Sequence, residues 1–240
     1  MNTFSDWEDD NEPLHACVMF INKCFLHGIP SKSDYTLMVI HGEFGKLAFF
    51  RPGLKSWITV TLWNSHCSDI IYYNEQFYAI DVSGRIVVID IKSDNTHLAH
   101  QVANMPQTHL KQGLDKVYLV EIDGILLVVI RNRKEEVTFS FEVLQVELST
   151  NTWTEVHSLG NKTLFLGDNS SLAIETLELS GCKSNCIYFT EDYTDEYYGT
   201  EKGGGKDMGI YHLEDGRIEP HFNGDSCYLF TPPLWVEKSF

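Results

Sequence analysis

Apolar residues fall into short runs of strand character along nearly the whole chain. Tyr35–Ile40, Trp57–Leu62 and Val117–Ile122 are rich in β-branched and aromatic residues, which favour strands. Phe139–Leu148 largely alternates apolar and polar residues, as a strand with one buried face does. The pattern predicts strands over 35–40, 46–50, 57–62, 70–73, 77–80, 86–89, 117–122, 125–130, 139–148, 153–156, 164–166, 187–190, 209–213 and 217–218.

Turn residues separate these runs at short intervals. Asp123-Gly124 and Asp215-Gly216 are dipeptides that favour tight hairpins, and Ser83-Gly84 and Asn74–Gln76 are further turn candidates. No segment of 12 or more residues shows a convincing helical period. Residues 164–179 come nearest but are interrupted by polar residues and a glycine, and residues 105–114 leave room for one helical turn. The sequence therefore predicts an all-β protein.

A group of strands recurs along the chain. Residues 49–60 and 146–156 each hold an apolar strand end, a polar turn, a tryptophan that opens the next strand, and a valine three residues later. Trp57 and Trp153 are 153 − 57 = 96 residues apart, or two periods of roughly 48, which is typical of one four-stranded blade of a kelch-like β-propeller. Each tryptophan would fill the gap to the neighbouring blade. The alternative is a β-sandwich with two similar hairpins, which short strands at this spacing also fit.

The propeller hypothesis gives the turn glycines a structural role. The hairpins within blades would be closed by Gly84, Gly124 and Gly216. The outer strands of two blades would be marked by Trp57 and Trp153. At about 48 residues per blade, the 240 residues provide at most five blades, or four once the tail and loops are set aside.

Composition narrows the function classes. The chain has 18 Lys+Arg against 34 Asp+Glu, a net charge of −16, which argues against nucleic-acid and anionic-membrane partners because both require clustered cations. A hydrophobic content of 43% excludes general disorder. The longest apolar run, Ile125–Ile130, is far shorter than the roughly 20 residues of a membrane helix. Residues 1–15 are acidic and expected to be disordered, which leaves 16–240 for the propeller.

The N-terminus and the cysteines predict a cytosolic or nuclear protein. Residues 2–12 hold five acidic residues and lack the basic and apolar regions of a secretory signal. Six cysteines are too few for a disulfide scaffold of this length, so reduced thiols are expected.

No motif predicts a catalytic, cofactor or metal site. Cys182-x3-Cys186 resembles half of a zinc site, but a second pair with suitable spacing is missing, although Cys227 and His221 could be spatial partners. Gly203–Lys206 is followed by an aspartate in place of the Ser or Thr of a phosphate-binding loop. The chain contains no Gly-x-Ser-x-Gly nucleophile motif.

An acidic, tyrosine-rich segment over 191–198 is the best candidate for an interaction site. It is followed by several glycines, so we expect a solvated loop between two strands of one blade. Tyrosines on such a loop supply rigid contact area at low entropic cost. The candidate binding residues are Tyr193, Tyr197, Tyr198, Asp192 and Glu196.

Several stretches together resemble plant F-box proteins that carry a KIB-type β-propeller. The signature is the run Gly42–Trp57, with its Phe-Phe-Arg-Pro-Gly-Leu-Lys-Ser-Trp ending. Other matching stretches are Tyr72–Arg85, Leu164–Ser171, Cys186–Tyr193, Asp207–Pro220 and the ending Thr231–Trp235. The resemblance covers about 20–235, nearly the whole chain.

The resemblance implies a propeller that recruits targets for an SCF ubiquitin ligase, which typical members join through an N-terminal helical F-box. No apolar helix precedes the propeller here, and the first blade or blades of the family also have no counterpart. An incomplete propeller without an F-box is therefore expected, and binding to the SCF adaptor is not. Its unburied edges would make self-association possible.

Three hypotheses for function follow. The first is a non-enzymatic interaction module that recognises an unknown protein target, without cofactors. The second is an enzyme with an active site in the propeller channel, which would require polar side chains converging from several blades. The third is a non-functional truncated paralogue.

Overall fold

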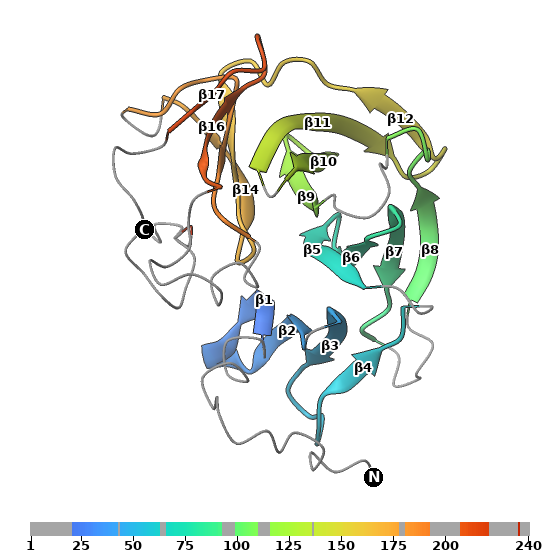
Figure 1. The fold of residues 1–240 in the computed structure, drawn as a ribbon. Helices are drawn as coiled ribbons and strands as arrows, with labels where there is room; N and C mark the ends of the chain where they lie inside the picture. Colours follow the sequence, from blue (N-terminus) through green and yellow to red (C-terminus); the bar gives the residue numbers. More distant parts are fainter. Residues whose placement is uncertain are drawn as a thin grey trace, which may run out of the picture.

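The chain folds into four β-sheets that radiate from a common centre (Figure 1). This computed structural model describes residues 21–42, 44–62, 66–92, 99–109, 116–135, 137–177, 181–192, 207–220 and 235. The sheets are a β-propeller of four blades, as the strand repeat predicted, and not the two facing layers of a sandwich.

Blades 1 to 3 are four-stranded and follow the chain from the centre outward. Blade 1 comprises β1 (Ile21–Ile29), β2 (Asp34–His41), β3 (Lys46–Phe50) and β4 (Ile58–Val60), with a short 3-10 helix, Pro30–Lys32, after β1. Blade 2 comprises β5 (Cys67–Tyr73), β6 (Gln76–Asp81), β7 (Arg85–Ile89) and β8 (Ala99–Asn104). Blade 3 comprises β9 (Lys116–Ile122), β10 (Ile125–Lys134), β11 (Val137–Glu147) and β12 (Thr152–Glu155).

Blade 4 has five strands and a different order. It comprises β13 (Lys162–Leu166), β14 (Ser171–Glu175), β15 (Cys186–Phe189), β16 (Gly209–His212) and β17 (Ile218–Glu219). The order across the sheet is β14-β13-β15-β16-β17, so β14 takes the inner position and β13 pairs parallel with β15. The innermost strands of the four blades are β1, β5, β9 and β14 (Figure 1).

Apolar clusters fill the spaces between successive blades. One cluster joins blades 1 and 2 around Phe49 and Phe77, a second joins blades 2 and 3 around Ile86 and Val128, and a third joins blades 3 and 4. The fourth cluster contains blade 4 residues and Trp235 only. Among the described residues, therefore, no apolar cluster joins blade 4 to blade 1, and the apolar packing forms an arc rather than a full circle.

The turns lie where turn residues predicted them. Asp123 and Gly124 have φ values of 52° and 77°, as a two-residue hairpin with positive φ at both positions requires. Gly84 and Gly216 also have positive φ, at 75° and 72°. Residues 105–109, where room was left for a helical turn, form a hydrogen-bonded turn but no helix.

The two tryptophans of the repeat occupy equivalent places on different blades. Trp57 directly precedes β4 and Trp153 lies on β12, which are the outermost strands of blades 1 and 3. Trp153 is half-buried and packs against the cluster between blades 2 and 3. Trp57 is 46% exposed and contacts the ring of Phe50, so the expectation that it fills a gap between blades is wrong.

Candidate functional site

Polar side chains from three blades meet near the centre of the propeller. Lys23 on β1 forms an ion pair with Asp69 on β5, and its Nζ also donates to Ser171 Oγ on β14 at 3.2 Å. Ser171 Oγ donates to Asp69 Oδ2 at 3.2 Å, and the Leu119 N–H of β9 donates to the same oxygen at 2.9 Å. Asp69 thus ties the inner strands of all four blades together.

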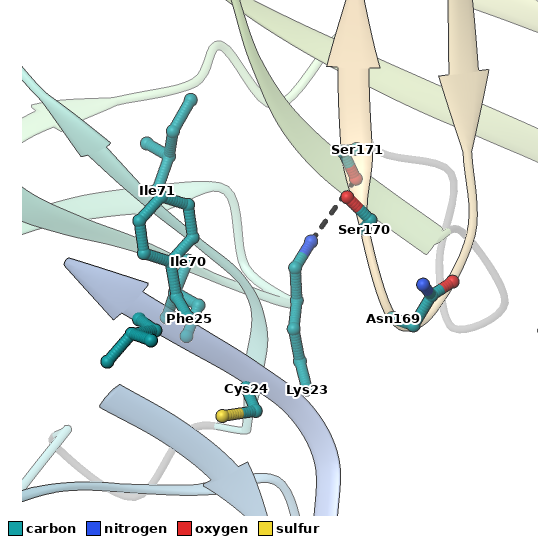
Figure 2. Close-up of a pocket in the computed structure, with 9 residues that line it drawn as sticks. Lys23, Cys24, Phe25, Ile70, Ile71, Asn169, Ser170 and Ser171 are labelled. Carbon is teal, nitrogen blue, oxygen red and sulfur yellow. Dashed lines mark hydrogen bonds between the residues drawn. The ribbon is translucent and has the colours of Figure 1, made fainter. Parts of the chain in front are cut away.

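A cavity opens between the inner ends of blades 1, 2 and 4 (Figure 2). Its volume is about 190 Å³, and residues from β1, β5 and the turn before β14 line it. Figure 2 shows the Lys23 side chain directed toward Ser170 and Ser171 at the wall of this cavity. The cavity is small for a ligand pocket, since such pockets usually hold several hundred Å³.

A second ion pair, between Lys116 on β9 and Asp168, lies beside the first. The Asp168 side chain is 19% exposed. Burial and the neighbouring Asp192 carboxylate raise the pKa of Asp168 to about 6, although the Lys116 and Lys23 ammonium groups oppose this shift. A carboxyl group that titrates near neutral pH therefore faces the polar centre.

The turn over residues 167–170 connects the central cluster to the space between blades 3 and 4. Asp168 contacts Lys116 through its side chain, while its backbone N–H donates to Asp192 Oδ1 at 3.1 Å. Asn169 contacts Trp235, and Ser171 follows the turn and contacts Lys23. This turn lies within Leu164–Ser171, one of the stretches that carried the family resemblance.

Arg131 is fully buried between blades 3 and 4 and binds both ends of the β15–β16 connection. Its Nη1 donates to the Thr190 carbonyl oxygen at 2.7 Å, and its Nη2 donates to the Asp207 carbonyl oxygen at 2.7 Å. Nη1 also lies 3.5 Å from Asp192 Oδ2, which accepts the Tyr118 hydroxyl at 2.6 Å. One guanidinium group thus holds the residues that precede and follow residues 193–206.

Asp207 completes this buried network. Its carboxylate accepts hydrogen bonds from the Thr138 backbone N–H at 2.8 Å and from Arg133 Nε at 3.1 Å. Its own N–H donates to Glu191 Oε2 at 2.9 Å. Burial by itself would lower the pKa of Arg131, but the Tyr118 hydroxyl and the two aspartates raise it above its usual value. The guanidinium therefore stays charged, which a paired buried arginine requires.

Of the five predicted binding residues, the structure describes Asp192 alone. Tyr193, Glu196, Tyr197 and Tyr198 lie outside the described residues. Asp192 was expected on an exposed loop, and that expectation is wrong: its side chain is buried and belongs to the Arg131 network. Its position after β15 explains the difference, because the first residues of the connection still pack against blade 3.

Of the charged residues in the two networks, Asp192 alone was singled out from the sequence, and for a different role. Arg131 directly follows the apolar run Ile125–Ile130, and Asp69 directly precedes Ile70-Ile71. A single charge at the end of a buried strand is a usable signal, because it must find a partner inside the fold.

The described residues hold no group of three or more His, Cys, Asp or Glu side chains able to bind a metal ion. Cys186 is buried, with Sγ 3.4 Å from His212 Nδ1, while His221 and Cys227 lie outside the described residues.

Comparison with protein families agrees with this architecture. The model of the KIB1-4 β-propeller matches residues 1–212, most of the chain. This chain belongs to the KIB1-4 β-propeller family. The resemblance found in its sequence is thereby confirmed.

Proteins similar to this KIB1-4 propeller include three F-box proteins of Arabidopsis thaliana. F-box protein At2g17036 is 29% identical over 82% of this chain and 52% of its own length, and F-box protein SKIP23 is 24% identical over 91% and 58%. Putative F-box protein At5g55150 is 28% identical over 90% and 60%. The chain thus spans between about half and three fifths of the length of these relatives. No helix within the described parts of the propeller has the length and apolar character needed to cross a membrane.

Proposed function

We propose that this chain is a non-enzymatic protein-interaction module that recognises a protein target. The observation that carries the proposal is the hold of Arg131 on both ends of the β15–β16 connection. Fixing the two ends lowers the conformational entropy that the intervening residues lose when they bind. Those residues include Tyr193, Tyr197 and Tyr198, a residue type that is enriched at protein interfaces.

The alternative of a channel enzyme has one observation in its favour, because Lys23, Asp69 and Ser171 converge from three blades. However, both carboxylate oxygens of Asp69 already accept backbone N–H groups, from Ile70 and Leu119. Lys23 and Asp69 are both buried and neutralise each other. This saturation supports a structural role for the central cluster rather than acid–base chemistry.

A second part of the proposal concerns the role of the chain in a ubiquitin ligase. The relatives are F-box proteins, and the described residues of this chain belong to blades and to the connections between them. We therefore expect the chain to contribute target recognition only. A binding assay with the purified chain and the purified SCF adaptor subunit is expected to give no complex, and a stable complex would contradict this division of roles.

The test is affinity purification from plant extract with three forms of the chain. A variant with Tyr193→Ser, Tyr197→Ser and Tyr198→Ser is expected to lose the partner that the unchanged chain retains. Phe44→Ser with Trp57→Ser is the matched control, because it removes exposed aromatic rings from blade 1. The control should retain the partner, and circular dichroism should show that both variants are folded. Equal recovery by the two variants would refute the proposed binding surface.

A further inference from the structure

Trp235 is bound to blade 4 through both its side chain and its backbone. Its indole Nε1 donates to the Leu166 carbonyl oxygen at 2.8 Å, and its ring meets Phe165 edge-on with centroids 4.8 Å apart. Asn169 Nδ2 donates to the Trp235 carbonyl oxygen at 2.7 Å, while Asn169 Oδ1 accepts the Trp235 N–H at 3.2 Å. One carboxamide therefore pairs with both backbone polar groups of Trp235, as a neighbouring β-strand would.

The surface beneath the indole is shaped for it. A Cβ atom added to Gly167 would lie 3.0 Å from Trp235 Cδ1 and 2.8 Å from Thr190 Oγ1. The φ of Gly167 is not in the left-handed region, so space rather than backbone conformation favours glycine here. Phe165 belongs to the apolar cluster on this face of blade 4, and Trp235 packs against that cluster.

We propose that Phe165, Leu166, Gly167 and Asn169 form a tryptophan notch: a binding site for a tryptophan in an extended peptide of a partner protein. Trp235 occupies the notch within the chain and would compete with that partner. The contacts use only the indole and the backbone of one residue, and they join residues 66–70 positions apart in sequence. Any extended segment with a tryptophan offers the same groups.

The notch lies on the face of blade 4 that no apolar cluster of the described residues joins to blade 1. The notch borders the β15–β16 connection at Thr190, but its four residues differ from the tyrosines of the proposed target site, so different variants test the two proposals. Because Trp235 is tethered, its effective concentration at the notch is of millimolar order, and a free peptide must displace it. The unchanged chain should therefore bind such a peptide at least about tenfold more weakly than a chain without Trp235.

The probe is a fluorescent peptide with the sequence Thr231-Pro-Pro-Leu-Trp235, titrated into the full chain and followed by fluorescence anisotropy. Trp235→Ala is expected to bind it at least about tenfold more tightly than the unchanged chain does. A peptide with alanine in place of tryptophan should not bind. Adding Asn169→Ala to Trp235→Ala should weaken binding roughly tenfold, because two hydrogen bonds are lost. Trp57→Ala, which removes an exposed indole elsewhere, should behave as the unchanged chain.

Folded Trp235→Ala that binds neither peptide, or binds both equally, would overturn the proposal. Trp235→Phe is the second variant if the alanine variant does not fold, because it retains a ring but lacks the indole N–H. It is expected to bind the tryptophan peptide with intermediate affinity, and absence of binding by folded Trp235→Phe would overturn the proposal too. If the unchanged chain forms a dimer that Trp235→Ala abolishes, the occupant is a second copy, and a partner peptide is excluded.

Discussion

At the scale of single residues, Arg131 is a charged side chain in the interior whose loss has a predictable cost. It is fully buried, and its guanidinium faces the buried carboxylates of Asp192 and Asp207. Replacing one member of such a pair leaves the other charge without compensation in the interior. Arg131→Met is therefore expected to lower the free energy of unfolding by about 3–5 kcal/mol.

Urea unfolding followed by circular dichroism measures this change. Arg217→Met is the matched control, because Arg217 is exposed and exposed ion pairs contribute little. Asp192→Asn added to Arg131→Met should restore part of the lost stability, since it removes a buried carboxylate that has lost its arginine. Equal midpoints for Arg131→Met and Arg217→Met would show that the network is not structural.

Asp168 predicts a pH dependence of stability. Its pKa in the folded chain is about 6, above the usual value of about 3.9 in an unfolded chain, so folding favours the protonated form. The stability that this group contributes is fully present below about pH 4 and is lost as the pH rises through about 6. Asp168→Asn removes this dependence, because an amide does not titrate.

Between pH 4 and pH 7.5, the free energy of unfolding of the unchanged chain should therefore fall by up to about 3 kcal/mol relative to that of Asp168→Asn. Urea titrations at several pH values measure the difference between the two proteins. Asp34→Asn, at an exposed aspartate on β2, is the control and should follow the unchanged chain. A constant difference between Asp168→Asn and the unchanged chain across this range would contradict the prediction.

At the scale of elements, two hairpin turns allow opposite substitutions at positions of positive φ to be compared. Asn74 and Glu75 have φ values of 50° and 64°, and neither is glycine, whereas Gly124 has a φ of 77°. Gly124→Ala should destabilise the chain by about 1 kcal/mol, because the added Cβ meets no atom within 4 Å and the cost is conformational. Glu75→Gly should stabilise it by about 0.5 kcal/mol. Thermal unfolding compares both variants, and shifts of the same sign would count against the argument.

Most strands could be predicted, but β1, β8 and β14 could not. Most residues of these three strands are half-buried or exposed, so they lack the apolar runs of β3 or β10. β1 and β14 are innermost strands. β14 also follows Gly167–Asn169, which suggested a broken helix. The same inner strands supply Lys23 and Ser171. Local patterns could therefore not predict the central cluster, because it exists only once distant blades converge.

Residues 191–198 were expected between two strands of one blade, and β15 and β16 flank them, while their binding role stays a prediction. The acidic, tyrosine-rich composition located this connection, but its anchoring depends on Arg131, which lies 59 residues before Thr190 and 76 before Asp207. Only the order of the blades places Arg131 beside Thr190 and Asp207. The parallel pairing of β13 with β15 was equally invisible, because it requires a crossover that hydrophobic patterning does not encode.

At the scale of the whole molecule, the contact between blades 1 and 4 differs from the contacts between the other neighbouring blades. Lys23 and Ser171 bridge them near the centre, but no apolar cluster of the described residues does so. On β1, Phe25 packs toward blade 2, so alternation along the strand directs Leu26 to the opposite face. Leu26 is 49% exposed, and with Ile21, which is 51% exposed, it leaves apolar surface on this strand.

Unpaired apolar surface of this kind favours association between copies. We expect the purified chain to form a concentration-dependent dimer in size-exclusion chromatography with light scattering. Leu26→Lys should shift it to the monomer, because a lysine at that interface would have to lose its hydration. Val137→Lys is the control, since Val137 is 59% exposed on blade 3, away from β1. A dimer that resists Leu26→Lys, or that Val137→Lys dissolves equally well, would place the contact elsewhere, and a monomer at every concentration would show that blades 1 and 4 need no second copy.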